Sequence, residues 1–397
     1  MASSLVHFVS LMLLFVFITK VKSDQKVFNV RRFGVVPHGK TDSSRIILAV
    51  WNRACQYNGR GVVLIPKGTY LANRMVFNGP CRGQTVFLLR GHLNAPTDRG
   101  SWANSDHWIV FRHVDNLEIG GGGSFDGQGL SAWPYNKCDK NPYCDQLPIS
   151  LRFDFVTNSW IHDIKLINSK NFHMNVYGCR DTTIEHIQII APDNSPNTDG
   201  IHIGSTTNLK IYNSYISTGD DCVSIGPGTE NLDIYGLVCG PGHGISIGSL
   251  GKYPNEPDVK GLVIRNCNLT GTQNGLRIKT WAPSPASKVY NLTFENINMK
   301  DVSNPIIIDQ QYCPNSGGCP NRGSSQVQIF DVKYRNIWGT SKTKVSVNLN
   351  CSPSKPCQRV ELTDINLFYS GPGGPAISQC FNANGFSQGR QRPQACI

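Results

Sequence analysis

The sequence predicts an all-β protein built as a parallel β-helix, with one short helix at the N-terminal end of the stack. A phrase of alternating apolar residues recurs from about residue 110, most clearly at 208–213, 231–236, 261–266 and 291–296. Neighbouring copies are mostly about 20 to 30 residues apart, which is the range expected of solenoid turns. The 39 glycines, and the lack of long runs of Ala, Leu, Glu and Lys, also favour strands and turns over helices.

A second phrase lies between these copies and begins at Asp199, Asp221, His243 and Asn274. Each repeat therefore contains at least two short strands with one apolar face. Two such strands cannot bury their apolar faces alone, so successive repeats must stack. A leucine-rich repeat would need a helix and a Leu-x-x-Leu-x-Leu run, and the sequence contains neither. Asn residues at the turns can adopt left-handed backbone angles and form ladders along the stack.

One helix is predicted over residues 43–55, where apolar residues recur near helical spacing. We expect this helix to cover the N-terminal end of the stack. That end would otherwise expose an apolar cross-section and unpaired strand edges.

The first 23 residues have the features of a signal peptide. The apolar run Leu11–Ile18 is too short to span a bilayer, and Ser23 offers a small residue for cleavage. We expect a mature protein formed by residues 24–397 as one domain. No second apolar stretch approaches membrane length, so no membrane attachment is expected.

Fourteen cysteines suit an oxidising, extracytoplasmic compartment. Their spacing is not that of a zinc site. Close pairs that could form local disulfides are Cys222/Cys239, Cys351/Cys357 and Cys380/Cys396, although spacing alone leaves the connectivity open. Three sequons, at Asn268, Asn291 and Asn350, are candidate N-glycosylation sites.

The formal charge is +11, and removal of Lys20 and Lys22 with the signal peptide leaves +9. A basic secreted protein can bind acidic polysaccharide, nucleic acid or membrane, or the charge can serve solubility alone. The sequence contains no stripe of Lys and Arg interleaved with aromatic residues, which argues against nucleic acid.

Stacking of the repeats places chemistry-bearing residues in a column. Asp199, Asp221 and His243 occupy equivalent positions of consecutive coils, about 4.8 Å apart, and Asp220 lies beside them. If all three carboxylates were ionised they would repel one another, so one of them should have a raised pKa. A protonated carboxyl group beside an ionised carboxylate is the arrangement that glycoside hydrolysis requires.

Three further side chains enter the same region. Arg277 and Lys279 alternate on the next strand, so they share a face and could bind a substrate carboxylate. His202 occupies a position that Ser224 and Ser246 fill in later coils, which favours a structural or outer role over a catalytic one.

At these residues the sequence resembles the polygalacturonase family, glycoside hydrolase family 28, and within it the plant pollen-type exopolygalacturonases. The motifs are Asn197-Thr198-Asp199, Gly219-Asp220-Asp221, Gly242-His243-Gly244 and Arg277-Ile278-Lys279. The likeness extends from about Val27 to the C-terminus. It implies a right-handed β-helix that hydrolyses polygalacturonate with inversion, without a metal ion or other cofactor.

The resemblance also implies roles for individual residues. Asp220 corresponds to the general acid, supported by His243, while Asp199 and Asp221 correspond to the pair that activates water. Substrate-binding positions are Asn197, Arg277, Lys279 and Tyr312, of which Tyr312 rests on position rather than on a dense motif. Because Asp220 and Asp221 would point to opposite faces of a regular strand, we expect a turn or bulge to reorient one of them.

Alternatives differ in reaction or in mode. A pectate lyase would use Ca²⁺ and elimination, a rhamnogalacturonan hydrolase would share fold and mechanism, and a non-catalytic β-helix would only bind polysaccharide. Exo and endo cleavage depend on whether loops block the cleft, with candidates at 135–147, 249–260 and 309–325. The resemblance favours exo cleavage, secretion to the plant cell wall and a role in loosening pectin during pollen-tube growth. A monomer is expected of a capped solenoid.

Overall fold

The computed structural model describes residues 24–103, 105–136, 146–314 and 323–397. The predicted signal peptide, residues 1–23, lies outside the described residues. Within the described ranges, no helix combines the length and the apolar character that crossing a bilayer would require.

The strands form two groups of parallel pairings. An eleven-stranded sheet contains at most one strand from each coil: β5 (Met75–Asn78), β8 (His107–Arg112), β11 (Ile149–Asp154), β14 (Met174–Tyr177), β17 (Ile201–Gly204), β20 (Val223–Ile225), β23 (Ile245–Leu250), β25 (Asn274–Trp281), β27 (Asn304–Tyr312), β29 (Val345–Asn350) and β31 (Ile377–Phe381). The other strands are β1 (Gln25–Asn29), β2 (His38–Asp42), β3 (Arg60–Ile65), β4 (Thr69–Leu71), β6 (Thr85–Leu89), β7 (His92–Asn94), β9 (Leu117–Gly120), β10 (Ser124–Asp126), β12 (Thr157–His162), β13 (Lys165–Ile167), β15 (Arg180–Glu185), β16 (Gln188–Ile190), β18 (Thr207–Tyr212), β19 (Tyr215–Ser217), β21 (Glu230–Tyr235), β22 (Val238–Cys239), β24 (Val259–Thr270), β26 (Ser287–Val302), β28 (Val327–Ser341), β30 (Cys357–Tyr369) and β32 (Ala383–Arg392). The helices are α1 (Ser44–Cys55) and α2 (Arg99–Trp102), with 3₁₀ turns η1 (Val30–Phe33), η2 (Gly129–Ser131) and η3 (Trp133–Tyr135).

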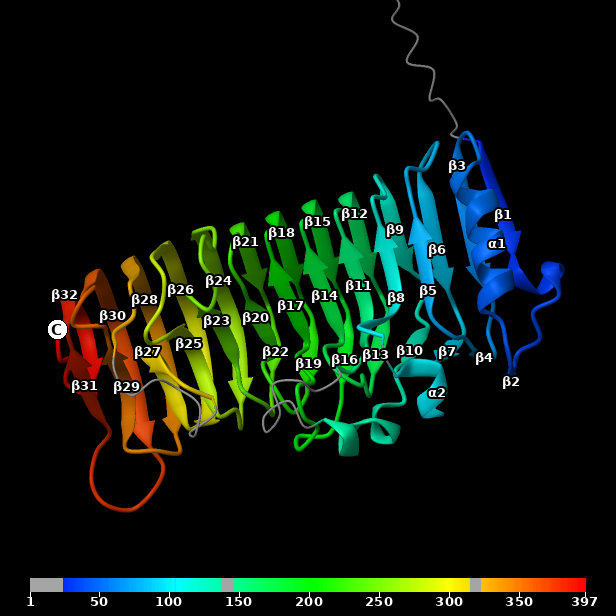
Figure 1. Cartoon of the computed structure of the whole chain (residues 1–397). Coiled ribbons are helices and arrows are strands. Elements are labelled where there is room, and N and C mark those ends of the chain that lie inside the picture. The colour runs from blue at the N-terminus through cyan, green and yellow to red at the C-terminus, as the bar shows by residue number, and fades with distance from the viewer. Residues whose placement is uncertain (1–23, 104, 137–145, 315–322) are drawn as a thin grey trace, which may run out of the picture.

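These strands stack into a long coil whose axis runs from the α1 end to the C-terminus (Figure 1). Central coils have three strands, as in β17, β18 and β19. From β24 onward one long strand replaces two, since β21 and β22 both pair with β24. The prediction of a parallel β-helix is confirmed.

The register of the stack follows the apolar residues of the repeats. Met174, Ile201, Val223, Ile245 and Leu276 are consecutive partners across β14, β17, β20, β23 and β25. Each of these side chains is at most 1% exposed. A slip by one residue would turn every apolar side chain of a strand outward, so this core holds the neighbouring polar positions in register too.

Helix α1 lies at the N-terminal end of the stack, as predicted (Figure 1). Its residues Ile47, Val50 and Trp51 are completely buried. The Trp51 ring packs on Phe77 and Phe111 with centroids 5.0 and 5.4 Å away, so the helix seals the end of the apolar core.

Asparagines in the turns adopt the predicted left-handed conformation. Asn208, Asn231 and Asn291 have φ values of 55°, 56° and 56°. The side chain of Asn231 donates to that of Asn208 at 3.2 Å, which forms one step of an asparagine ladder.

Four disulfides are present among the described residues: Cys55–Cys81, Cys222–Cys239, Cys351–Cys357 and Cys380–Cys396. The first was not anticipated from the sequence, because its cysteines are 26 residues apart and meet only when α1 packs on the stack. Cys179 and Cys267 are buried free thiols.

The three sequons differ in accessibility. Asn268 and Asn291 are exposed. Asn350 is half-buried, and the hydroxyl of its Ser352 is buried and donates to the carbonyl of Ser325 at 2.8 Å. Glycosylation therefore stays a prediction, better supported by geometry at the first two sites.

Candidate active site

Three turns that precede β17, β20 and β23 carry the acidic column. Ile201, Val223 and Ile245 are register partners, so the residues two positions before them, Asp199, Asp221 and His243, come from equivalent places in consecutive coils. The sequence suggested that the middle strand began at Asp221, whereas β20 begins at Val223. Residues 219–222 form a bend, and strand alternation therefore does not set the directions of Asp220 and Asp221.

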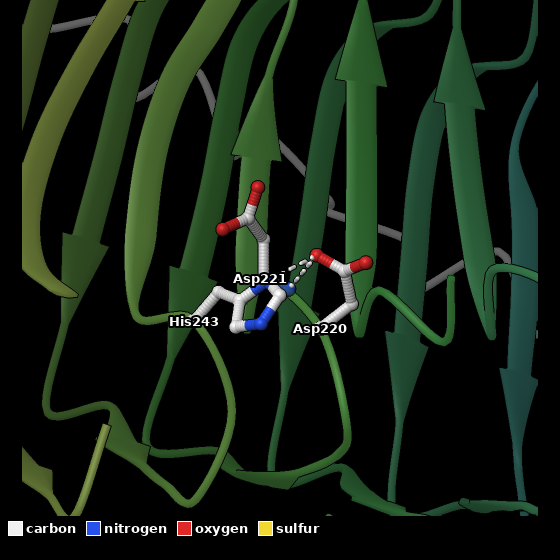
Figure 2. A group of neighbouring side chains, drawn as sticks. All are labelled: Asp220, Asp221 and His243. Carbon is white, nitrogen blue, oxygen red and sulfur yellow. Dashed lines mark hydrogen bonds and ion pairs between the residues drawn. The ribbon is translucent and has the colours of Figure 1, made fainter. Parts of the chain in front are cut away.

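Asp220 is hydrogen-bonded to His243. Its Oδ1 lies 2.9 Å from Nδ1 of His243 and accepts the backbone N–H of Asp221 at 2.8 Å (Figure 2). The Asp220 side chain is 19% exposed, and its Oδ2 has no hydrogen-bond partner among the described residues. One carboxyl oxygen is thus held by the protein while the other is free to meet a ligand.

Asp221 has the opposite environment, and its carboxylate points away from the Asp220–His243 pair (Figure 2). Oδ1 accepts from Arg277 Nη2 and from Ser246 Oγ, both at 2.7 Å, and Oδ2 accepts from Lys279 Nζ at 2.8 Å. The side chain is 2% exposed. Burial by itself raises the pKa of Asp221, but the charges of Lys279 and Arg277 outweigh burial and make the net shift downward.

Asp199 is the acid whose pKa is raised. Burial is the largest cause, and the negative charges of Asp220 and Asp221 add to it. Ser224 Oγ donates to Asp199 Oδ2 at 2.6 Å, which opposes the rise without cancelling it. The sequence predicted that one acid of the cluster would hold a proton, and the resemblance gave the acid role to Asp220, whereas in the structure the raised pKa belongs to Asp199.

Buried polar partners that the sequence analysis missed hold the Asp199 turn. His173 is completely buried, and its backbone N–H donates to the carbonyl oxygen of Asp199 at 2.8 Å. Its ring atom Nδ1 lies 3.2 Å from the same oxygen. Burial lowers the pKa of His173 to about 4, so this ring is neutral. Thr198 Oγ1 accepts the N–H of Gly219 at 3.1 Å and links the Asp199 turn to the Asp220 bend.

Arg277 and Lys279 face the cluster as predicted, but both make ion pairs with Asp221. Tyr312 lies beside them, with its ring centroid 5.3 Å from Lys279 Nζ, and packs edge-on against Trp281 at 5.8 Å. Asn197 has a left-handed φ of 53°, and its side-chain oxygen accepts from Asn136 Nδ2 at 2.9 Å. Asn136 was not identified from the sequence, because 61 residues separate it from Asn197.

A cleft of about 580 Å³ runs over the acidic column. Asn136, Leu147, Lys252 and Tyr312 are among the residues that line it. These residues belong to the three segments predicted to flank the cleft, 135–147, 249–260 and 309–325. Residues 137–145 and 315–322 of these segments lie outside the described residues. Asp199, Asp220, Asp221 and Lys279 are accessible from the cleft.

In the described part of the chain, Asp220, Asp221 and His243 are the group that most resembles a set of metal ligands, with donor atoms within 4.8 Å of one another. Both Asp221 oxygens already accept from cationic side chains, and these charges oppose binding of a cation. The donor set therefore fits acid–base chemistry better than metal coordination.

Comparison with known proteins gives a consistent result. The model of glycosyl hydrolases family 28 matches residues 55–396. The exopolygalacturonase of Platanus acerifolia is 44% identical over 374 residues, which cover 94% of this chain and 98% of that protein. The polygalacturonase of Brassica napus is 47% identical over 359 residues, covering 90% and 89%. The endo-xylogalacturonan hydrolase from Aspergillus tubingensis has a similar fold, with a TM-score of 0.77 at 22% identity, over 92% of this chain and 100% of that chain.

Proposed function

The chain belongs to glycosyl hydrolases family 28, and we propose that it is a secreted exopolygalacturonase that hydrolyses α-1,4-linked galacturonate in pectin with inversion at the anomeric carbon. The resemblance seen in the motifs is confirmed at the level of the family. The observation that carries the proposed chemistry is the convergence of three carboxyl groups on one cleft in three different environments.

Asp220 is the proposed general acid. Its Oδ1 is held by His243 and by a backbone N–H, so a proton on Oδ2 would be directed into the cleft toward a glycosidic oxygen. His243 is 37% exposed and orients this carboxyl group; it also supplies a nearby proton carrier.

Asp199 and Asp221 are the proposed pair that activates water, and their surroundings suggest different parts in that task. Arg277, Lys279 and Ser246 occupy both oxygens of Asp221, which therefore stays ionised and acts through its charge. Asp199 Oδ1 has no hydrogen-bond partner among the described residues. Asp199 is thus the better base, and catalysis requires a form in which Asp220 carries the proton and Asp199 is ionised.

Arg277 and Lys279 both pair with the carboxylate of Asp221, so two positive charges lie together at the cleft. We propose that a galacturonate carboxylate binds there, next to Lys279 and Tyr312, with Arg277 contributing charge. A rhamnose unit has no carboxylate to place at this position, which disfavours rhamnogalacturonan as substrate.

Exo cleavage is supported by relatives and by the walls of the cleft. The Platanus acerifolia relative is named an exopolygalacturonase. Asn136 bonds directly to Asn197, so the segment around η3 narrows the cleft beside the catalytic turn. Trp133 Nε1 donates to the carbonyl of Ser169 at 3.0 Å and fixes this segment to the stack. An obstructed cleft admits a chain end more readily than the middle of a polymer.

Secretion, action in the plant cell wall and a monomeric state complete the proposal. The disulfides among the described residues suit an oxidising compartment. The basic net charge favours association with acidic polysaccharide.

Product analysis on de-esterified polygalacturonate with EDTA present tests this function. We expect free galacturonic acid to appear early while the viscosity of the solution persists. A rapid fall in viscosity with mixed oligomers would replace exo by endo cleavage. Activity lost in EDTA, with unsaturated products when Ca²⁺ is restored, would indicate a lyase, and no reducing ends under either condition would leave only polysaccharide binding.

A further inference from the structure

Two serines bind the two buried aspartates in the same way. Ser224 Oγ donates to Asp199 at 2.6 Å, and Ser246 Oγ donates to Asp221 at 2.7 Å. In each case the serine belongs to the coil after that of its aspartate. The register of β17, β20, β23 and β25 places both serines in one column, between His202 and Arg277.

The neighbours of the two serines differ in chemistry. Arg277 Nε donates to Ser246 Oγ at 2.9 Å, and a guanidinium group can only donate. Ser246 therefore always directs its single proton to Asp221. Ser224 instead meets Nδ1 of His202 at 2.8 Å, and this nitrogen donates in one neutral tautomer and accepts in the other. The hydrogen bond between Ser224 and Asp199 can consequently reverse.

His202 is placed to connect this hydrogen bond with the cleft. Its ring stacks on Phe172 at a centroid distance of 4.8 Å and an interplanar angle of 24°, which fixes its orientation. His202 lines the cleft, and its Nε2 has no hydrogen-bond partner among the described residues. The charged groups that act on the ring are Lys279 and Asp221; burial first, and then Lys279, lowers the pKa of His202 to about 4. The ring is therefore neutral at working pH, as an exchange of tautomers requires.

We propose that Ser224 and His202 form a proton relay through which Asp199 exchanges its proton with the cleft. This rests on the proposed function of Asp199 as base. When Asp199 ionises, its Oδ2 proton passes to Ser224 Oγ, the serine proton passes to His202 Nδ1, and the Nε2 proton of His202 passes to water. One proton leaves, every donor keeps an acceptor, and the same steps in reverse reprotonate Asp199. His202 and Ser224 act through Asp199 and are positioning residues.

Variants at His202 separate a relay from a structural role. We expect H202A to lower kcat on polygalacturonate by about 10- to 100-fold with little change in KM, and added imidazole to restore part of the loss. We expect H202N to be as impaired as H202A, because an amide can donate to Ser224 but cannot pass a proton on. S224A should show the same loss without rescue by imidazole.

The matched control is S246A, which removes the corresponding hydroxyl from Asp221 in the adjacent coil and should show no imidazole effect. Thermal midpoints verify that each variant is folded. Two results would overturn the relay: a folded H202A or H202N variant with wild-type kcat, or a loss of kcat in H202A that imidazole does not restore. In either case, activity of the wild-type protein in the same assay would leave the proposed function intact.

A measurement without turnover tests the relay even if the proposed function fails. In protein labelled with ¹⁵N-histidine, we expect the ring of His202 to change from the Nε2–H to the Nδ1–H tautomer as Asp199 ionises. The D199N variant shows whether the change of tautomer depends on Asp199, because this substitution should abolish the change. One unchanged tautomer across the titration of Asp199 would overturn the proposal.

Discussion

We expect replacement of Asp220 with Asn to lower kcat on polygalacturonate by about 10²- to 10⁴-fold, with KM changed far less. The amide retains the size of the side chain and its contacts with His243, but it has no proton to give to a leaving oxygen. Initial rates of reducing-end release, measured over a range of substrate concentrations, give both constants.

The same substitution at Asp193 is the control, since Asp193 is exposed and has no role in the account. D193N should match the wild type. If D220N retained more than a tenth of the wild-type kcat, Asp220 would not be the general acid.

Neutralising the two buried aspartates should change stability in opposite directions. D221N leaves Arg277 and Lys279 buried without their carboxylate, and we expect a loss of about 3–5 kcal/mol in the free energy of unfolding. D199N removes a charge that burial and two neighbouring carboxylates disfavour, so it should be more stable than the wild type at neutral pH. Both variants should be nearly inactive.

The pH dependence follows from the direction of each pKa shift. The lowered pKa of Asp221 contributes stability above its unfolded pKa, near 3.8, and this contribution is lost as the pH falls through the folded pKa. The raised pKa of Asp199 means that the folded state holds a proton that the unfolded state releases above pH 3.8, so stability falls as the pH rises toward the folded pKa. Thermal midpoints at pH 7 and near pH 3.5 should show the advantage of D199N at the higher pH only. Loss of stability in D199N at pH 7, or a fully stable D221N, would contradict these assignments.

Much of the fold followed from the repeats, because the period-two apolar pattern determines both the strands and their register. That register alone places Asp199, Asp221 and His243 in one column, and helical spacing identified α1. A turn or bulge at Asp220 and Asp221 was expected, but its geometry could not be derived, because it depends on how residues 219–222 leave the preceding strand.

Contacts between segments that are distant in the sequence could not be predicted either. The protonation of Asp199 depends on its burial and on which cations pair with Asp221, and the repeats specify neither. The repeats placed Ser224 and Ser246 at the position equivalent to His202, but nothing in the sequence indicated that these serines bind the buried aspartates. The contact between Asn136 and Asn197 joins segments outside the repeat and has no sequence signal.

The most direct test of the central claim, hydrolysis by an acid, a water and a base, is the configuration of the first product. Proton NMR during early turnover of polygalacturonate distinguishes the anomers of released galacturonic acid before they equilibrate. We expect the β-anomer to appear first, because water attacks the face opposite the α-linked leaving group. Initial release of the α-anomer, or of an unsaturated sugar, would contradict it.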